Sequence, residues 1–141
     1  MKRKGSAHWT GDLRTGKGTI STESGALTNL PYGFATRFGD EKGTNPEELI
    51  GAAHASCFTM ALSNELSKAG IANPVIDTTA TVEIKQQDGG FAITSSHLTV
   101  TITAKGADKA AAQNAADTAK ANCPVSKLLK AEISMDATID V

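Results

Sequence analysis

Residues 45–70, NPEELIGAAHASCFTMALSNELSKAG, predict the long helix around which the rest of the fold is built. Asn45 suits the N-cap, and Glu48 completes a capping box with it. Gly70 stands where a left-handed residue would end the helix. Between these ends, small and apolar residues leave no continuous polar face. We therefore expect a helix over residues 45–69 that is buried on most sides.

The segments on either side of this helix alternate apolar and polar residues, as strands with one buried face do. Residues 6–22 predict two short strands around a Gly-rich turn, and residues 31–48 predict a polar connection interrupted by glycines. Residues 77–106 alternate Thr with Val, Ile and Leu on both sides of Asp88-Gly89, a pair that favours a tight turn. A long two-stranded hairpin is therefore expected after the helix.

The C-terminal part of the chain predicts one more helix and one more strand. The Ala-rich residues 108–122 predict a helix that Pro124 stops, and residues 131–141 alternate apolar side chains as a final strand. This order of elements predicts an α+β fold in which an antiparallel sheet wraps around the central helix. At 141 residues, with no repeat and no linker, we expect a single domain over 1–141.

Composition disfavours several classes of partner. Fourteen basic and fifteen acidic residues leave a net charge of -1, and no basic cluster marks a surface for nucleic acid or an anionic membrane. No apolar run approaches the roughly 20 residues that span a bilayer, so we expect a cytoplasmic protein. In a reducing compartment, two cysteines are not expected to form a permanent structural disulfide. A bond between them is better explained as transient and catalytic.

The two cysteines have different expected environments. Cys57 lies within an apolar helix, where a cysteine is by default a small hydrophobic residue. Cys123 precedes Pro124 at the N-cap of a short helix that runs to Leu129, and the free N–H groups there lower a thiol pKa. These rules make Cys123 the better thiolate. For Cys57 to react, another group must supply positive charge.

The histidines offer one further route to chemistry. His54 lies three residues before Cys57 on the same helix face, so a Cys–His pair is geometrically possible. The same two residues, with Cys123 and either His8 or His97, are the one route to a metal site, but no short-spaced ligand pair supports it. We expect a core or interface histidine, and neither a metal nor a cofactor.

Arg37 and Glu47 each have a structural and a functional interpretation. Arg37 lies among aromatic residues, where its guanidinium could simply stack on Phe34 or Phe38. Glu47 is at the second position of the expected helix, either as a surface charge favoured by the helix dipole or as a group that orients Arg37.

Two segments, GFATRFGDEKGTNPEELIGAAHASCF (33–58) and NCPVSKLLKAEI (122–133), resemble the OsmC (osmotically inducible protein C) family. These are thiol-dependent peroxidases related to the organic hydroperoxide resistance proteins. The resemblance extends from the first expected strand to the last, and residues 32–58 are its most diagnostic part. Residues 72–121 fit in pattern without a distinctive motif. The arginine in the TRF motif fits the OsmC branch of the superfamily.

The resemblance implies a role for each candidate residue. Cys57, in AAHASCF, is expected to be the peroxidatic nucleophile, and Cys123, in NCPVS, the resolving thiol. The arginine of TRF is Arg37 and the glutamate of NPEEL is Glu47, a pair expected to activate Cys57. Organic hydroperoxides, and hydrogen peroxide less efficiently, would then be reduced through a Cys57 sulfenic acid that Cys123 converts to an intramolecular disulfide.

Helix geometry constrains how such a site is assembled. Glu47 and Cys57 are ten residues apart, about 15 Å along a straight helix. One helix cannot easily bring both to a single point. We therefore expect Arg37 and Glu47 of one subunit to reach Cys57 of the other, and the resemblance implies an intertwined homodimer with two composite sites.

The surroundings of the motif indicate the substrate. Aromatic residues near it favour an apolar entrance, and hence alkyl or lipid hydroperoxides. These residues are Tyr32, Phe34, Phe38 and Phe58. An external thiol or dithiol must then reduce the disulfide.

Other functions would use the same residues differently. A thiol-disulfide redox sensor would need both thiols without peroxide chemistry. A small-molecule-binding stress protein would keep the pocket without needing Cys57. A cysteine hydrolase is disfavoured, because His54 has no orienting acid beside it and no oxyanion-hole motif is visible.

Overall fold

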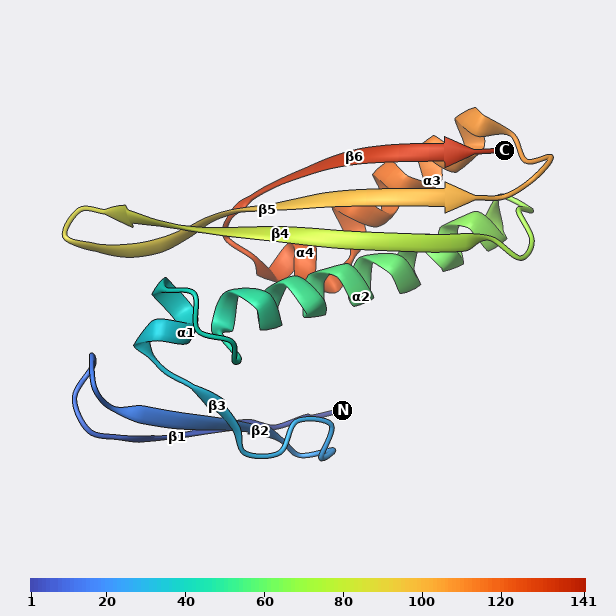
Figure 1. The fold of residues 1–141 in the computed structure, drawn as a ribbon. Helices are drawn as coiled ribbons and strands as arrows, with labels where there is room; N and C mark the ends of the chain where they lie inside the picture. Colours follow the sequence, from blue (N-terminus) through green and yellow to red (C-terminus); the bar gives the residue numbers. More distant parts are fainter. The chain divides into compact units, whose positions relative to one another are not determined.

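The computed structural model describes residues 1–141 and has an α+β fold with two three-stranded sheets and four helices (Figure 1). The predicted fold class is confirmed. The chain divides into two compact units, Met1–Leu49 (unit 1) and Ile50–Val141 (unit 2). None of the helices combines the length and the apolar character that crossing a membrane requires.

Unit 1 is built on a small antiparallel sheet in the order β1-β2-β3. The two predicted strands are present as β1 (Gly5–Thr10) and β2 (Lys17–Thr22). The expectation of a plain connection over residues 31–48 is wrong, because the chain there forms β3 (Leu30–Tyr32) and then α1 (Phe34–Phe38). Elements of three and five residues are too short for an alternating or helical period to show in the sequence.

The predicted long helix is present as α2 (Pro46–Lys68). The side-chain oxygen of Asn45 accepts a hydrogen bond from the backbone N–H of Glu48 at 2.8 Å, which is the first bond of the predicted capping box. At the other end, Gly70 has a φ of 76°, a left-handed conformation that glycine adopts without strain. Both ends of the helix are therefore set by local chemistry.

The second sheet belongs to unit 2 and has the order β4-β5-β6. β4 (Val75–Gln87) and β5 (Gly90–Thr103) form the predicted antiparallel hairpin. Asp88 and Gly89 between them have φ values of 45° and 80°, as a type I′ turn requires. The expectation of a purely antiparallel sheet is wrong for the last strand, because β6 (Glu132–Asp140) pairs with β5 in parallel.

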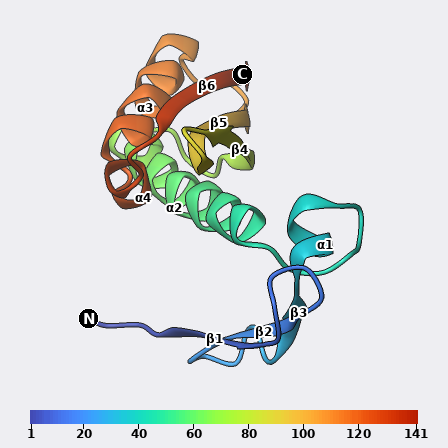
Figure 2. The same ribbon diagram turned by 90° about the vertical axis from the view of Figure 1, so that its left-hand side faces the viewer.

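A parallel pair needs a crossover connection, and two helices provide it. They are α3 (Lys109–Asn122), which confirms the predicted Ala-rich helix, and α4 (Pro124–Leu128), which confirms the short helix after Cys123. In Figure 2, α3, α4 and the body of α2 lie on the same face of the β4-β5-β6 sheet. This face of the sheet is the one that carries the core.

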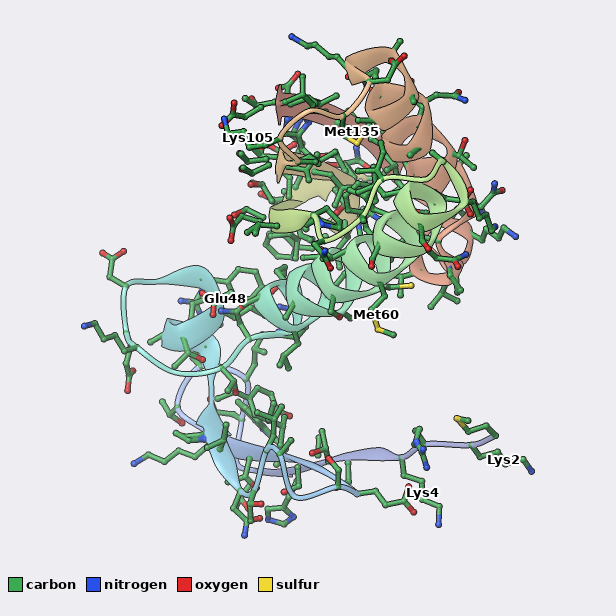
Figure 3. All side chains as sticks on the ribbon, turned by 90° about the vertical axis from the view of Figure 1, so that its right-hand side faces the viewer. Lys2, Lys4, Glu48, Met60, Lys105 and Met135 are labelled. Atoms are coloured by element: carbon green, nitrogen blue, oxygen red, sulfur yellow. The ribbon has the colours of Figure 1, made fainter.

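The burial of α2 differs from the prediction of a helix covered on most sides. One stripe is buried, and it consists of Gly51, His54, Phe58, Leu62 and Leu66. Another face is open to solvent and includes Ala52, Ala53, Ser56, Met60 and Ser63. Met60 is 77% exposed and projects from the side of α2 that faces away from the β4-β5-β6 sheet (Figure 3). A single chain therefore covers this helix along one side only.

The hydrophobic core lies entirely in unit 2. Alternate residues of β5 face the buried stripe of α2 and the alanines of α3. The main contributors from the strand are Leu98, Val100 and Ile102. In unit 1, by contrast, the buried residues are Gly18, Asn45 and Glu47, and no hydrophobic side chain reaches full burial.

Candidate functional site

Arg37 and Glu47 form a close ion pair within unit 1. Nη2 of Arg37 donates to Oε1 of Glu47 at 2.7 Å, and Nε donates to both carboxylate oxygens at 3.1 and 3.3 Å. This two-pronged contact fixes the plane of the guanidinium. The side chain of Glu47 is 10% exposed and that of Arg37 is 35% exposed. The Arg37 side chain therefore remains partly accessible to another group.

Two adjoining helix ends bring this pair together. Arg37 lies in the last turn of α1, and Glu47 lies in the first turn of α2, where a carboxylate interacts favourably with the helix dipole. The side-chain amide of Asn45 donates to the carbonyl of Thr36 at 3.4 Å and ties α1 to the start of α2. The guanidinium carbon of Arg37 also lies 5.3 Å from the centroid of the Phe38 ring. The guanidinium of Arg37 thus stacks on Phe38 and pairs with Glu47 at the same time.

Of the four aromatic residues predicted to line a substrate entrance, three lie in unit 1. Tyr32 and Phe34 line a pocket of about 290 Å³ that also includes Arg14. Phe38 packs against Phe34, with ring centroids 5.1 Å apart. The fourth, Phe58, is fully buried in the core of unit 2, where it anchors the part of α2 that carries the first cysteine.

The two cysteines are free thiols that interact with one another in unit 2. Cys57 lies in the middle of α2 and is half-buried. Cys123 is fully buried and occupies the N-cap of α4, as the sequence predicts. The two residues are 66 positions apart in the chain, and the fold brings them close enough for each to shift the pKa of the other.

The two sulfurs have opposite pKa shifts. Burial raises the pKa of Cys57, and the neighbouring Cys123 raises it further, against a smaller opposing effect of the Val125 N–H. Burial also disfavours the Cys123 thiolate, but hydrogen bonds from Cys57 and from Ser126 outweigh it and hold the pKa of Cys123 below its ordinary value. Cys123 is therefore the better thiolate, as predicted. None of the named influences on Cys57 is a cation, so unit 2 by itself does not activate it.

His54 is fully buried and makes two hydrogen bonds to serines. Its Nδ1 lies 2.7 Å from Oγ of Ser96, and its Nε2 lies 2.8 Å from Oγ of Ser126. Both ring nitrogens are thus engaged, and the possible Cys57–His54 pair is not formed. Burial lowers the pKa of His54, which keeps the ring neutral at neutral pH.

Sequence reasoning missed both serines. Ser96 is on the inner face of β5, two residues before Leu98, and a polar residue at such a position is a sign of a buried partner. Ser126 follows the N-cap Cys123 by three residues, a spacing that brings two side chains together at a helix start. No group of three His, Cys, Asp or Glu residues is arranged to hold a metal ion.

The predicted site residues therefore form two clusters, one in each unit. The Arg37–Glu47 pair of unit 1 supplies a fixed positive charge. The Cys57–Cys123 pair of unit 2 supplies two sulfurs that can be oxidised to a disulfide. The thiol pair by itself is suited to oxidation and reduction at sulfur.

Comparison with known proteins adds a family relationship. The family model described as OsmC-like protein matches residues 39–138. Peroxiredoxin OsmC of Escherichia coli (strain K12) is 57% identical over 136 residues, which cover 96% of this chain and 95% of that protein. Organic hydroperoxide resistance protein OhrB of Bacillus subtilis is 30% identical over 120 residues, 84% of this chain and 85% of OhrB. The crystal structure of an organic hydroperoxide resistance protein from Elizabethkingia anophelis superimposes with a TM-score of 0.72 at 26% identity, covering 99% of this chain and 97% of the other.

Proposed function

Because the chain belongs to the OsmC family, we propose that it is a thiol-dependent peroxidase that reduces organic hydroperoxides, and hydrogen peroxide less efficiently. Relatives named as a peroxiredoxin and as organic hydroperoxide resistance proteins match most of its length. The observation that carries the proposal is the pair of free, interacting thiols, Cys57 and Cys123, with opposite pKa shifts.

In the first proposed step, the thiolate of Cys57 attacks the hydroperoxide. Its sulfur bonds to the terminal oxygen, the O–O bond breaks, and the electron pair leaves on the other oxygen. That alkoxide takes up a proton and departs as an alcohol. The sulfur has lost two electrons and the peroxide has gained two, so Cys57 becomes a sulfenic acid.

Arg37 is the group proposed to drive this step. Lowering a thiol pKa from about 8.5 to about 6 raises the thiolate fraction at neutral pH from roughly 3% to roughly 90%. The less basic thiolate is intrinsically about 13-fold slower, at a Brønsted slope near 0.45. Only a two- to threefold gain remains, so the guanidinium acts mainly on the negative charge that grows on the leaving oxygen. Glu47 holds the guanidinium in place.

In the second proposed step, the thiolate of Cys123 attacks the sulfenic acid. An S–S bond forms, the S–O bond breaks, and hydroxide leaves and is protonated to water. The lowered pKa of Cys123 favours this attack. An external thiol or dithiol then reduces the disulfide. Because the cycle must return both cysteines to thiols, it suits a reducing compartment, and the cytoplasm is the proposed location.

The complete site is proposed to be composite, with Arg37 and Glu47 of one subunit acting on Cys57 of the other. α2 is continuous from Pro46 to Lys68, so about 15 Å of helix separates Glu47 from Cys57 in one chain. Unit 1 also carries an open apolar groove, lined in part by Ala7, Ile20, Leu27 and Leu49. A second copy would cover this groove and the exposed face of α2.

The two units are proposed to belong to one domain over residues 1–141. A segment as small as Met1–Leu49, without a buried apolar side chain, has too little core to be stable alone. In a homodimer the subunits would complete each other. Tyr32, Phe34 and Phe38 are then proposed to make the entrance apolar and to favour alkyl or lipid hydroperoxides. The expectation that Phe58 also lines this entrance is wrong, because its side chain is fully buried in the core of unit 2.

Hydroperoxide turnover in the presence of a dithiol tests the proposal. The wild-type protein, Cys57→Ser and Cys123→Ser are compared with cumene hydroperoxide as substrate. We expect turnover to disappear in Cys57→Ser, and sulfenic acid to accumulate at Cys57 in Cys123→Ser, where a dimedone-type reagent traps it. Activity that survives in Cys57→Ser contradicts the assignment.

The alternative of a thiol-disulfide redox sensor shares these cysteines and is separated from the peroxidase by Arg37. In a peroxidase, Arg37→Ala abolishes peroxide consumption and leaves exchange with a small disulfide intact. Equal loss of both reactions favours the sensor. A small-molecule-binding protein, by contrast, would retain its function in Cys57→Ser.

A further inference from the structure

A buried chain of hydrogen bonds connects three elements of unit 2. Ser96 of β5 contacts Nδ1 of His54 on α2, and Nε2 of His54 contacts Ser126 of α4, at 2.7 and 2.8 Å. Ser96 and His54 are fully buried and Ser126 is 9% exposed. Three polar side chains in a small core need a reason beyond packing, because each must be kept satisfied.

This chain ends beside Cys123, which is buried at the N-cap of α4. Ser126 follows Cys123 by three residues, and its backbone N–H and its hydroxyl both act to lower the pKa of that thiol. The titratable group facing this sulfur is the Cys57 thiol from α2. Cys123 thus receives its stabilisation from neutral groups.

The direction of the hydrogen bonds follows from the charge at the sulfur. A thiolate accepts only, so the Ser126 hydroxyl must donate to it, and its oxygen must then accept from Nε2–H of His54. Nδ1 of His54 is then unprotonated and accepts from the Ser96 hydroxyl. When Cys123 is a thiol that donates to Ser126, the whole chain reverses and His54 carries its proton on Nδ1.

We propose that Ser126, held by His54 and Ser96, is a positioning residue for Cys123, because the buried Ser96–His54–Ser126 chain aims a hydroxyl proton at that sulfur and keeps it ready to attack the sulfenic acid at Cys57. This inference rests on the proposed peroxidase function for its purpose but not for its physical test. The tautomer of a neutral His54 is coupled to the ionisation of a cysteine that it does not touch.

The first test uses the reduced protein without peroxide. Carbon NMR of Cβ-labelled cysteine follows the titration of Cys123 in the wild type, Ser126→Ala, Ser96→Ala and Ser134→Ala. We expect Ser126→Ala to raise the Cys123 pKa by about one unit, the loss of a hydrogen bond to a charged group. Ser96→Ala removes the other His54 bond and weakens the support of Ser126, so a smaller shift in the same direction is expected. Ser134→Ala is the matched control, because it removes a serine hydrogen bond to a different histidine, His97, outside this chain. An unchanged pKa in Ser126→Ala, or an equal shift in Ser134→Ala, overturns the proposal.

A second measurement requires no substitution. Nitrogen NMR of the histidine ring reports which nitrogen of His54 carries the proton. Across the titration of Cys123 we expect the proton to move from Nδ1 to Nε2 while the ring stays neutral. A tautomer that does not change as Cys123 ionises, or that changes in the opposite sense, contradicts the chain direction.

A third measurement connects the chain to the reaction. After one equivalent of cumene hydroperoxide, Ser126→Ala should form sulfenic acid at the wild-type rate. At a pH below the Cys123 pKa of both proteins, it should convert the sulfenic acid to the disulfide about threefold more slowly than the wild type. The tenfold loss of thiolate is partly offset by its greater basicity. Unchanged resolution overturns the catalytic part of the proposal. If the wild type shows no peroxide turnover at all, the proposed function fails while the two NMR results stand.

Discussion

The two units of the chain bury their side chains differently. In unit 2, Phe58, Leu62 and Leu66 of α2 are fully buried against β5 and α3. In unit 1, the residues that reach burial are a glycine, an asparagine and a glutamate, and the apolar side chains remain partly open. The thiols therefore lie on a part of the chain with its own core, whereas the cation lies on a part that lacks one. This contrast supports the proposal that Arg37 reaches Cys57 only when two chains associate.

The largest expected effect is on the charged pair of unit 1. Replacing Arg37 by Met should slow sulfenic acid formation at Cys57 about 100- to 1,000-fold, because the leaving oxygen loses its fixed positive charge. Stopped-flow measurement with a single addition of hydroperoxide checks this. Arg14→Met is the matched control, since Arg14 of unit 1 also lies over an aromatic ring, 5.0 Å from the centroid of Phe34. An equal loss in both variants points to the pocket rather than to Arg37.

Mixing two inactive variants shows which chain supplies the arginine. If the site is composite, a dimer of one Arg37→Met chain and one Cys57→Ser chain keeps one intact site out of two. Random exchange makes half of the dimers mixed, so about a quarter of the wild-type turnover should return. Refolding the two variants together and assaying turnover checks this, with each variant refolded alone as the control. No recovery places Arg37 and Cys57 of the same chain in one site.

Dilution should affect the two units unequally. While a dimer dissociates, each tenfold dilution lowers the stability of structure that depends on the partner by about 1.4 kcal/mol. Hydrogen exchange should therefore speed up in β1, β2 and β3 on dilution, and much less in β4, β5 and β6, which are backed by the core of unit 2. Mass spectrometry of the exchanged peptides measures both in one sample. Concentration-independent exchange in unit 1 contradicts its dependence on a second copy.

The smallest expected effect is on the acid stability of unit 2. Burial lowers the pKa of His54 below its ordinary value of 6.5. At a pH just below 6.5, His54 is therefore protonated in the unfolded chain but stays neutral in the folded chain. This contribution to stability is complete above about pH 6.5 and is lost as the pH falls below it, by at most about 1.4 kcal/mol per pH unit. Thermal unfolding, measured at a series of pH values from neutral to mildly acid, gives this dependence of stability on pH. His54→Asn should reduce the loss of stability per pH unit, and His8→Gln, at an exposed position, should leave it unchanged.

The elements with local signals were predicted correctly. Asn45 and Gly70 mark the ends of α2, Asp88-Gly89 marks the hairpin turn, and Pro124 marks the start of α4. Each depends on backbone geometry within a few residues, so a sequence pattern suffices. The parallel pairing of β6 was missed because its alternating pattern is the same for a parallel and an antiparallel neighbour.

In the candidate site, as in the fold, local patterns predicted the features that depend on local sequence and missed those that depend on distant residues. The N-cap position of Cys123 predicted its lowered pKa, since a helix start acts on the residue that caps it. The serines around His54 were not predicted, because Ser96 and Ser126 are 42 and 72 residues away from it in the chain. Nothing local distinguishes a serine that faces a histidine from one that faces water.

The sequence by itself determined the long helix, the hairpin, the Ala-rich helix and the contrast between the two thiols, because caps, turns and side-chain periodicity act over a few residues. The pairing of Cys57 with Cys123 and of Glu47 with Arg37 was expected only from the family resemblance, and the tertiary structure alone decided that His54 is held between two serines. These contacts join residues ten to 72 positions apart. Their partners are chosen by packing, which no short stretch of the chain specifies.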